Sequence, residues 1–165
     1  MKKLVLLLVL IVAGFVIYRM MEDKPKETAK TESAVPATPH PVHREEVTAG
    51  AKLNSVFPKA DGEYKLTFTQ EKTGFAEADL FKGGAKLAAM TVSDTEATPA
   101  ARDKYKSSTK QLGRYPMAAN GSMGTAVLVA NRYQVQVRSL APAFTAAERE
   151  AWLEKFNLAK LAEIK

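Results

Sequence analysis

The sequence predicts an α+β domain behind a membrane anchor, with a mostly antiparallel sheet and two helices in the order βββα-βββα. The chain begins with a long apolar run, and a charged, proline-rich stretch follows it. Six later segments read as short strands, most of them with apolar and polar residues in alternation, and hairpin signals separate them, which is typical of antiparallel strands. Two further segments begin with helix N-cap signals. We therefore predict an anchor at residues 1–21, a tether at 22–48 and a folded domain at 50–165.

The apolar run covers residues 4–18 without a charged side chain, and we expect it to bind the membrane. Extended to residues 1–21, a helix would be about 31 Å long, which crosses a hydrocarbon core of ~30 Å if the flanking basic side chains reach the headgroups. Basic residues before an apolar core are also typical of a cleaved signal peptide, and this alternative stays open. Small residues suited to cleavage occur only inside the run, at Val12-Ala13-Gly14, which favours an uncleaved anchor.

The orientation follows from the basic residues before the run. Lys2 and Lys3 favour an N-terminus that stays inside, although Arg19 and the lysines of the tether weaken the charge asymmetry. We expect a single-pass protein of the cytoplasmic (inner) membrane, with its C-terminal domain on the extracytoplasmic, periplasmic side.

The tether combines four prolines with charges of both signs and has few large apolar residues, so it cannot bury a core of its own. It contains the two histidines of the chain, His40 and His43. Histidines at this spacing can bind a divalent metal weakly. The neighbouring prolines hold the stretch extended, however, and a solvated linker explains the residues better. We predict no metal site.

The first half of the domain is predicted to form three strands after a short helical turn around Leu53 and Phe57. Tyr64, Leu66 and Phe68 alternate with polar residues and indicate a strand that is buried on one face. Gly83-Gly84 is a signal for a tight hairpin, because glycine adopts the positive φ that such turns require. The predicted strands cover residues 63–70, 75–82 and 85–93.

The first helix is predicted from Thr98, as N-cap before a proline, to Leu112, with Gly113 as its stop. Three more strands follow at residues 114–119, 125–130 and 133–140. Pro116 places the first of them at an edge of the sheet. The second is almost entirely apolar, as expected for a central strand that is buried on both faces.

The last helix is predicted to begin at a capping box formed by Thr145 and Glu148. Trp152, Leu153 and Phe156 give it an apolar face, which further apolar residues continue to the end of the chain. We expect both helices to cover the same face of the sheet.

The residue types exclude several kinds of chemistry. The chain has no cysteine, and both histidines lie in the tether. The domain therefore lacks the residues for Ser-His-Asp or Cys-His catalysis and the usual ligands of a catalytic zinc. We predict a protein that is not an enzyme, without catalytic residues or a cofactor. The formal net charge of +6 is too dilute to indicate a nucleic acid as partner.

The candidate binding residues are Arg132, Gln134, Gln136 and Arg138, which alternate with Tyr133, Val135 and Val137. Long polar side chains in a row along one strand could bind a polymer that carries carboxylates or phosphates. The alternative is the ordinary solvated face of an antiparallel sheet.

The sequence supports two hypotheses for function. The first is a membrane-anchored extracytoplasmic interaction domain, a non-enzymatic accessory part of an envelope or membrane complex with a protein partner. The alternative is a binding module for an anionic small molecule or a cell-wall polymer. A pocket with converging polar groups would favour the module, whereas a continuous exposed apolar patch would favour the interaction domain. The sequence leaves the oligomeric state open.

Overall fold

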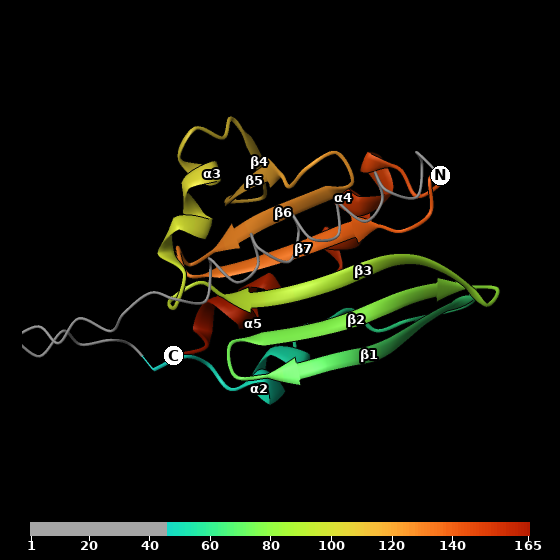
Figure 1. Cartoon of the computed structure of the whole chain (residues 1–165), viewed down its shortest axis with the longest axis horizontal. Coiled ribbons are helices and arrows are strands. Elements are labelled where there is room, and N and C mark those ends of the chain that lie inside the picture. Colours follow the sequence, from blue (N-terminus) through green and yellow to red (C-terminus); the bar gives the residue numbers. More distant parts are fainter. Residues whose placement is uncertain (1–45) are drawn as a thin grey trace, which may run out of the picture. The chain divides into compact units, whose positions relative to one another are not determined.

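The computed structural model describes residues 46–165, so the predicted anchor and most of the predicted tether lie outside this range. Within it, seven strands form one antiparallel sheet in the order β1-β2-β3-β7-β6-β5-β4 (Figure 1). The predicted α+β class is confirmed for this domain. The strands are β1 (Tyr64–Lys72), β2 (Phe75–Lys82), β3 (Ala85–Asp94), β4 (Lys110–Leu112), β5 (Tyr115–Ala119), β6 (Gly124–Val129) and β7 (Tyr133–Ser139).

The sheet consists of two meanders, β1 to β3 and β4 to β7. The second one returns, so that its last strand, β7, pairs with β3 at the centre of the sheet. The predicted hairpin between β2 and β3 is confirmed: Lys82 pairs with Ala85, and Gly83 and Gly84 have φ angles of +55° and +83°. The glycine pair therefore determines the pairing next to the turn, and a bulge between Leu80 and Phe81 shifts the register further along the strands.

The prediction of one long first helix is wrong. A 3-10 turn η1 (Pro99–Arg102) and a single helical turn α3 (Asp103–Lys106) end before Ser107, and only the last three residues of the predicted helix, Lys110–Leu112, form strand β4. The Ser108 hydroxyl hydrogen-bonds to the carbonyls of Lys110 and Met117, and such side chains compete with helical backbone bonds. Gly113, interpreted as the helix stop, lies in the hairpin between β4 and β5.

The extra strand also corrects the position of β5. Strand β4 forms the edge of the sheet, and β5 lies between β4 and β6. Pro116 pairs only with Gln111 of β4, because the ladder between β5 and β6 begins one residue later, at Met117. The proline therefore lies outside the more central ladder of its strand, where its missing N–H is tolerated.

Three helices cover one face of the sheet: α2 (Gly50–Asn54), α4 (Ala146–Glu154) and α5 (Leu158–Glu163). The main core lies beneath them. It contains the alternating residues Tyr133, Val135 and Val137 of β7, all fully buried as predicted. Trp152 of α4 is 4% exposed and makes an edge-on contact with Tyr64 of β1, at 5.1 Å between ring centroids.

Helix α3 lies on the other face, so the expectation that the helices cover one face is wrong. Tyr105 of α3 contacts Ala126 and Leu128 of β6, whose neighbours Val127 and Val129 face the main core. All six residues of β6 are buried, and the prediction of a strand buried on both faces is confirmed.

The predicted last helix is two helices. The capping box is present: the Thr145 hydroxyl accepts a hydrogen bond from the Glu148 amide, and the Glu148 carboxylate accepts one from the Thr145 amide. The helix ends after α4 and a new one begins, because the Asn157 side chain caps α5 by accepting a hydrogen bond from the Lys160 amide at 2.9 Å. No helix between residues 46 and 165 has the length and apolar character needed to cross a bilayer.

Candidate anion-binding pocket

The four predicted binding residues do not form one exposed row. Arg132 lies in the turn before β7 and is buried, whereas Gln134 and Gln136 are half-buried and Arg138 is exposed. The alternation along β7 was predicted correctly, but it does not extend to Arg132. A turn residue is free to direct its side chain to either face.

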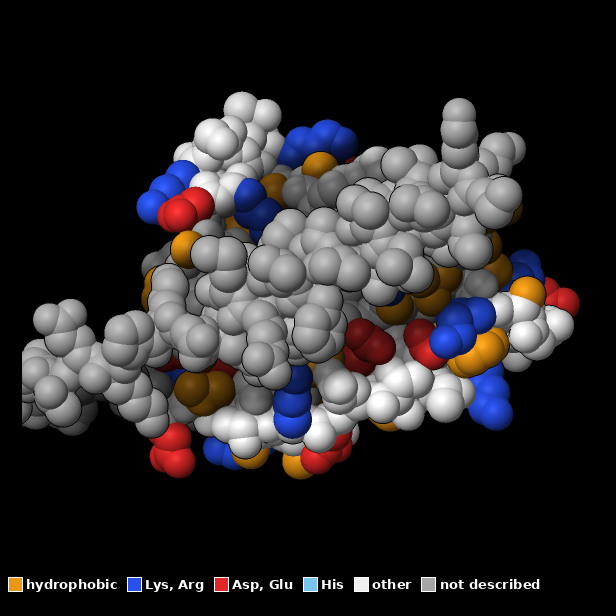
Figure 2. All heavy atoms as spheres, viewed as in Figure 1, with side chains coloured by type: hydrophobic (Ala, Val, Ile, Leu, Met, Phe, Trp, Pro, Cys, Tyr) orange, Lys and Arg blue, Asp and Glu red, His pale blue; other side chains and the backbone are white. Residues whose placement is uncertain are grey.

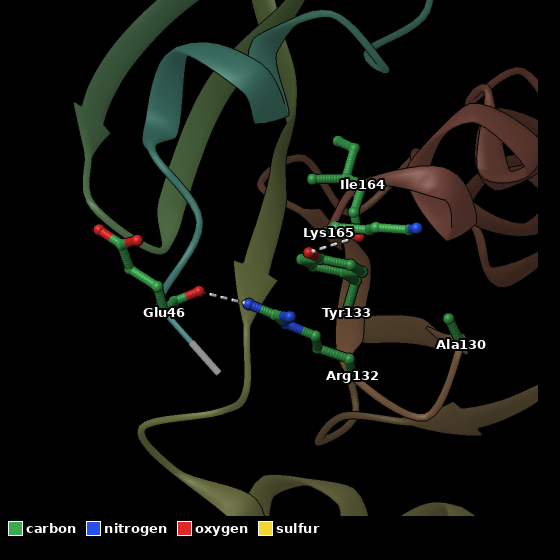
Figure 3. A pocket seen from close by; sticks show the side chains of 6 residues that line it. All are labelled: Glu46, Ala130, Arg132, Tyr133, Ile164 and Lys165. Carbon is green, nitrogen blue, oxygen red and sulfur yellow. Dashed lines mark hydrogen bonds between the residues drawn. The ribbon is translucent and has the colours of Figure 1, made fainter. Parts of the chain in front are cut away.

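Arg132 forms a buried ion pair with Asp94 at the end of β3. Its Nη2 lies 2.9 Å from Asp94 Oδ2, and its Nε lies 3.1 Å from Oδ1. The Arg132 Nη2 also donates to the Glu46 carbonyl at 2.7 Å (Figure 3). Asp94 Oδ2 accepts from the Thr48 amide at 2.9 Å. The pair thus holds residues 46–48, the last part of the predicted tether, against the domain.

The same contacts determine the charge state of Asp94. Burial alone would raise the pKa of its carboxyl group. The hydrogen bonds from Arg132 and from the amides of Thr48 and Glu96 outweigh burial and hold the pKa below its ordinary value of 3.8. Asp94 is therefore ionised at neutral pH and matches the charge of Arg132.

A pocket of about 490 Å³ lies beside this pair and is lined by Glu46, Ala130, Arg132, Tyr133, Ile164 and Lys165 (Figure 3). Its polar groups are bonded to one another: the Tyr133 hydroxyl lies 2.8 Å from Thr48 Oγ1 and donates to the Ile164 carbonyl at 3.1 Å. Asp94 already neutralises Arg132, so the guanidinium in this pocket has its counter-charge within the domain.

The other predicted residues lie on the sheet face opposite α4. The Tyr105 hydroxyl donates to Gln134 Oε1 at 3.1 Å, and Asn120 Nδ2 donates to Gln136 Oε1. Arg138 lies near the end of the strand, opposite Gly124 of β6. The two glutamines therefore have partners within the domain, and the proposed role of this face in binding stays a prediction.

A second buried arginine has a different environment. Arg149 of α4 is 8% exposed, and its hydrogen-bond acceptors are two neutral hydroxyls. Its Nε donates to Thr125 Oγ1 at 3.0 Å, and its Nη1 donates to Ser139 Oγ at 2.9 Å. Among residues 46–165, no carboxylate pairs with Arg149 and no acceptor meets its Nη2. A guanidinium has five N–H donors and stays charged, so part of its binding capacity is unused.

Arg149 forms one wall of a pocket of about 430 Å³ between the start of α4, strand β4 and the loop that joins β5 to β6. Lys110, Ser122, Ala146 and Glu150 also line it. Lys110 Nζ lies 3.3 Å from Glu150 Oε1, so these two charges match each other. Ala146 is the first residue of α4, and the N-terminus of a helix favours an anion.

Arg149 was not among the predicted binding residues, although the sequence contains a signal for it. Arg149 precedes Trp152 by three residues and Leu153 by four, so it lies on the buried face of α4. A charged residue on the apolar face of a helix indicates a buried charge, and buried charges need partners. The partners Thr125 and Ser139 are distant in sequence and could not be identified from spacing.

Within residues 46–165, acidic side chains do not gather in a group that could hold a metal ion. On the described part of the face in Figure 2, charged side chains of both signs are interspersed with small apolar areas. No protein-family model matches the chain, and neither a curated protein nor a solved structure is significantly similar to it.

Proposed function

We propose that this chain is a membrane-anchored, non-enzymatic binding module that holds an anionic group in the Arg149 pocket. Residues 1–21 anchor it in the cytoplasmic membrane, and the tether presents residues 50–165 on the periplasmic side. The proposal agrees with a domain that has neither histidine nor cysteine, since binding an anion requires only cationic and hydrogen-bonding groups.

The observation that carries the proposal is the unpaired charge of Arg149. Removing an ion from water costs several kcal/mol, and a nearby opposite charge normally offsets the cost. Arg149 has only the hydroxyls of Thr125 and Ser139. A bound anion would supply the missing counter-charge in a site that is already largely desolvated, where charge-assisted hydrogen bonds are strong.

A purely structural role for Arg149 is the alternative, because its hydrogen bonds link α4 to β6 and β7. Apolar residues of similar volume often replace buried charges without loss of stability, so a link alone does not require a guanidinium. The accessible pocket beside Arg149 favours binding over a structural link.

The thermal unfolding midpoint of the full-length chain tests the proposal, with sodium acetate or sodium phosphate replacing sodium chloride at constant ionic strength. A ligand that binds only the folded state raises the midpoint as its concentration increases. We expect this rise in the wild type and in Arg138→Gln, and its loss in Arg149→Gln. No rise with either anion, or an equal rise in Arg149→Gln, would contradict the proposal.

A protein-interaction function is a second candidate, favoured by strand β1. This strand is at the edge of the sheet, and its residues from Thr67 to Lys72 are exposed. Phe68 is 48% exposed although it contacts Phe57. Exposed edge strands can pair with a partner strand. Cross-linking in intact membranes should give an adduct that Phe68→Lys weakens; equal yields from both chains would argue against this surface.

The location is tested separately. A reporter that works only outside the cytoplasm, fused to the C-terminus, should be active, and the chain should stay with membranes after a high-salt wash. A silent reporter in a well-expressed fusion would contradict the orientation. A soluble form that lacks the first residues would support a cleaved signal.

A further inference from the structure

We infer that the ligand of the Arg149 pocket is a monocarboxylate with a short apolar substituent; this inference rests on the function proposed above. It follows from three properties of the pocket: its net charge, its apolar lining and its shape near Arg149.

The charge of the pocket suits a single negative charge. Three charged side chains line it, and Lys110 is matched by Glu150 at 3.3 Å. Arg149 is therefore the one charged residue of this lining whose charge is not matched by another. A carboxylate carries one charge and can accept two parallel hydrogen bonds from a guanidinium. A phosphate monoester carries between one and a half and two charges at neutral pH, as a rough figure, and would place the excess against the Glu150 carboxylate.

The rest of the lining is mostly apolar or small. Met117, Ala119 and Ala146 have side chains without a polar atom, and Gly121 and Gly124 have no side chain. A fully hydrated inorganic ion gains nothing from such surface, whereas an alkyl group does. A volume of about 430 Å³ also exceeds what a carboxylate alone would fill.

The guanidinium of Arg149 and the apolar part of the lining lie side by side in the pocket. Arg149 hydrogen-bonds to Thr125, and Thr125 pairs with Ala119 across β5 and β6. Partners that are directly opposite in an antiparallel pair direct their side chains to the same face. A carboxylate on Arg149 would therefore have the Ala119 methyl group beside it, where the first carbons of the substituent would lie.

Calorimetric titration of the full-length chain with acetate, propionate, butyrate and inorganic phosphate at constant ionic strength tests the inference. Affinity should increase roughly fourfold for each methylene group that is buried, and phosphate should bind more weakly than butyrate. Ala119→Leu fills the apolar part of the pocket and leaves Arg149 in place. It should lose the gain in affinity with chain length. Ala85→Leu, at an exposed position of β3 that does not line the pocket, is the matched control and should keep this gain.

The outcomes separate the inference from the proposed function. Phosphate binding tighter than butyrate, or carboxylates binding equally whatever their length, would overturn the inference and leave an anion-binding module. The same gain with chain length in Ala119→Leu would overturn it as well. No binding of any of the four anions would overturn both.

Discussion

Arg132 and Asp94 form a buried ion pair that joins the two meanders of the sheet: Nη2 lies 2.9 Å from Oδ2, and the two side chains are 9% and 0% exposed. Asp94 ends β3, and Arg132 precedes β7. The pair also holds the start of the domain through Thr48 and Glu46. Removing one partner would therefore leave a buried charge and release this segment as well.

Asp94→Asn is expected to lower the free energy of unfolding by about 3–5 kcal/mol, because the charge of Arg132 would stay buried without its partner. Chemical denaturation measures the change. Asp103→Asn is the control, since Asp103 pairs with Lys106 on the exposed surface at 2.7 Å and should alter stability by about 0.5 kcal/mol or less. Equal effects of the two changes would contradict the role given to the buried pair.

The same pair predicts a dependence of stability on pH. The pKa of Asp94 is lower in the folded state than its ordinary value of 3.8. A depressed carboxyl pKa stabilises the fold above the unfolded-state pKa, and this contribution is lost as the pH falls through the folded-state pKa. We expect the unfolding free energy of the wild type to fall below pH 3.8 more steeply than that of Asp94→Asn. Parallel curves would contradict the prediction.

Arg132 also shows where the sequence could not predict the site. Alternation along β7 identified the buried residues Tyr133, Val135 and Val137 correctly, because a strand has a period of two. The direction of Arg132 depends on Asp94, which is 38 residues away in sequence. Replacing Arg132 and Arg138 together would therefore destabilise the domain, although their alternation with apolar residues in the sequence predicts that both lie on the same face of the strand. Arg132 is unsuitable for testing surface binding.

The fold was predictable where short-range signals act alone. The glycine pair of the β2–β3 hairpin and the capping box of Thr145 and Glu148 both predict the observed geometry. The two helix predictions were wrong where a side chain forms hydrogen bonds that interrupt the helix. These side chains are Ser108 in the first predicted helix and Asn157 in the second. Both residues form hydrogen bonds whose value depends on tertiary neighbours, such as the Asn157 amide bonding to the Val56 carbonyl at 2.9 Å.

Trp152→Ala should lower the unfolding free energy by about 3–5 kcal/mol, because it would leave a cavity between α4 and the sheet. The indole is 4% exposed and contacts Tyr64. Phe68→Ala is the comparison, because Phe68 is 48% exposed and should cost much less. Equilibrium denaturation gives both values. A loss below about 1 kcal/mol for Trp152→Ala would mean that α4 does not close the core.

Thr145→Ala should cost about 1 kcal/mol through loss of the capping box of α4. Thr98 offers a matched control, since it precedes η1 as N-cap without a side-chain hydrogen bond. Thr98→Ala should therefore change stability little. The thermal midpoints of the two variants measure the difference, and a larger shift for Thr98→Ala would contradict the assignment.

Binding of an anion by Arg149 can be observed in a titration of the full-length chain with sodium propionate, followed by amide NMR. Thr125, Ser139 and Ala146 surround the guanidinium or line its pocket, so their amide signals should shift and saturate together. The Arg138→Gln chain should behave in the same way, whereas the Arg149→Gln chain should show no saturable shift. Absence of these shifts in the wild type, or their persistence in Arg149→Gln, would contradict the claim.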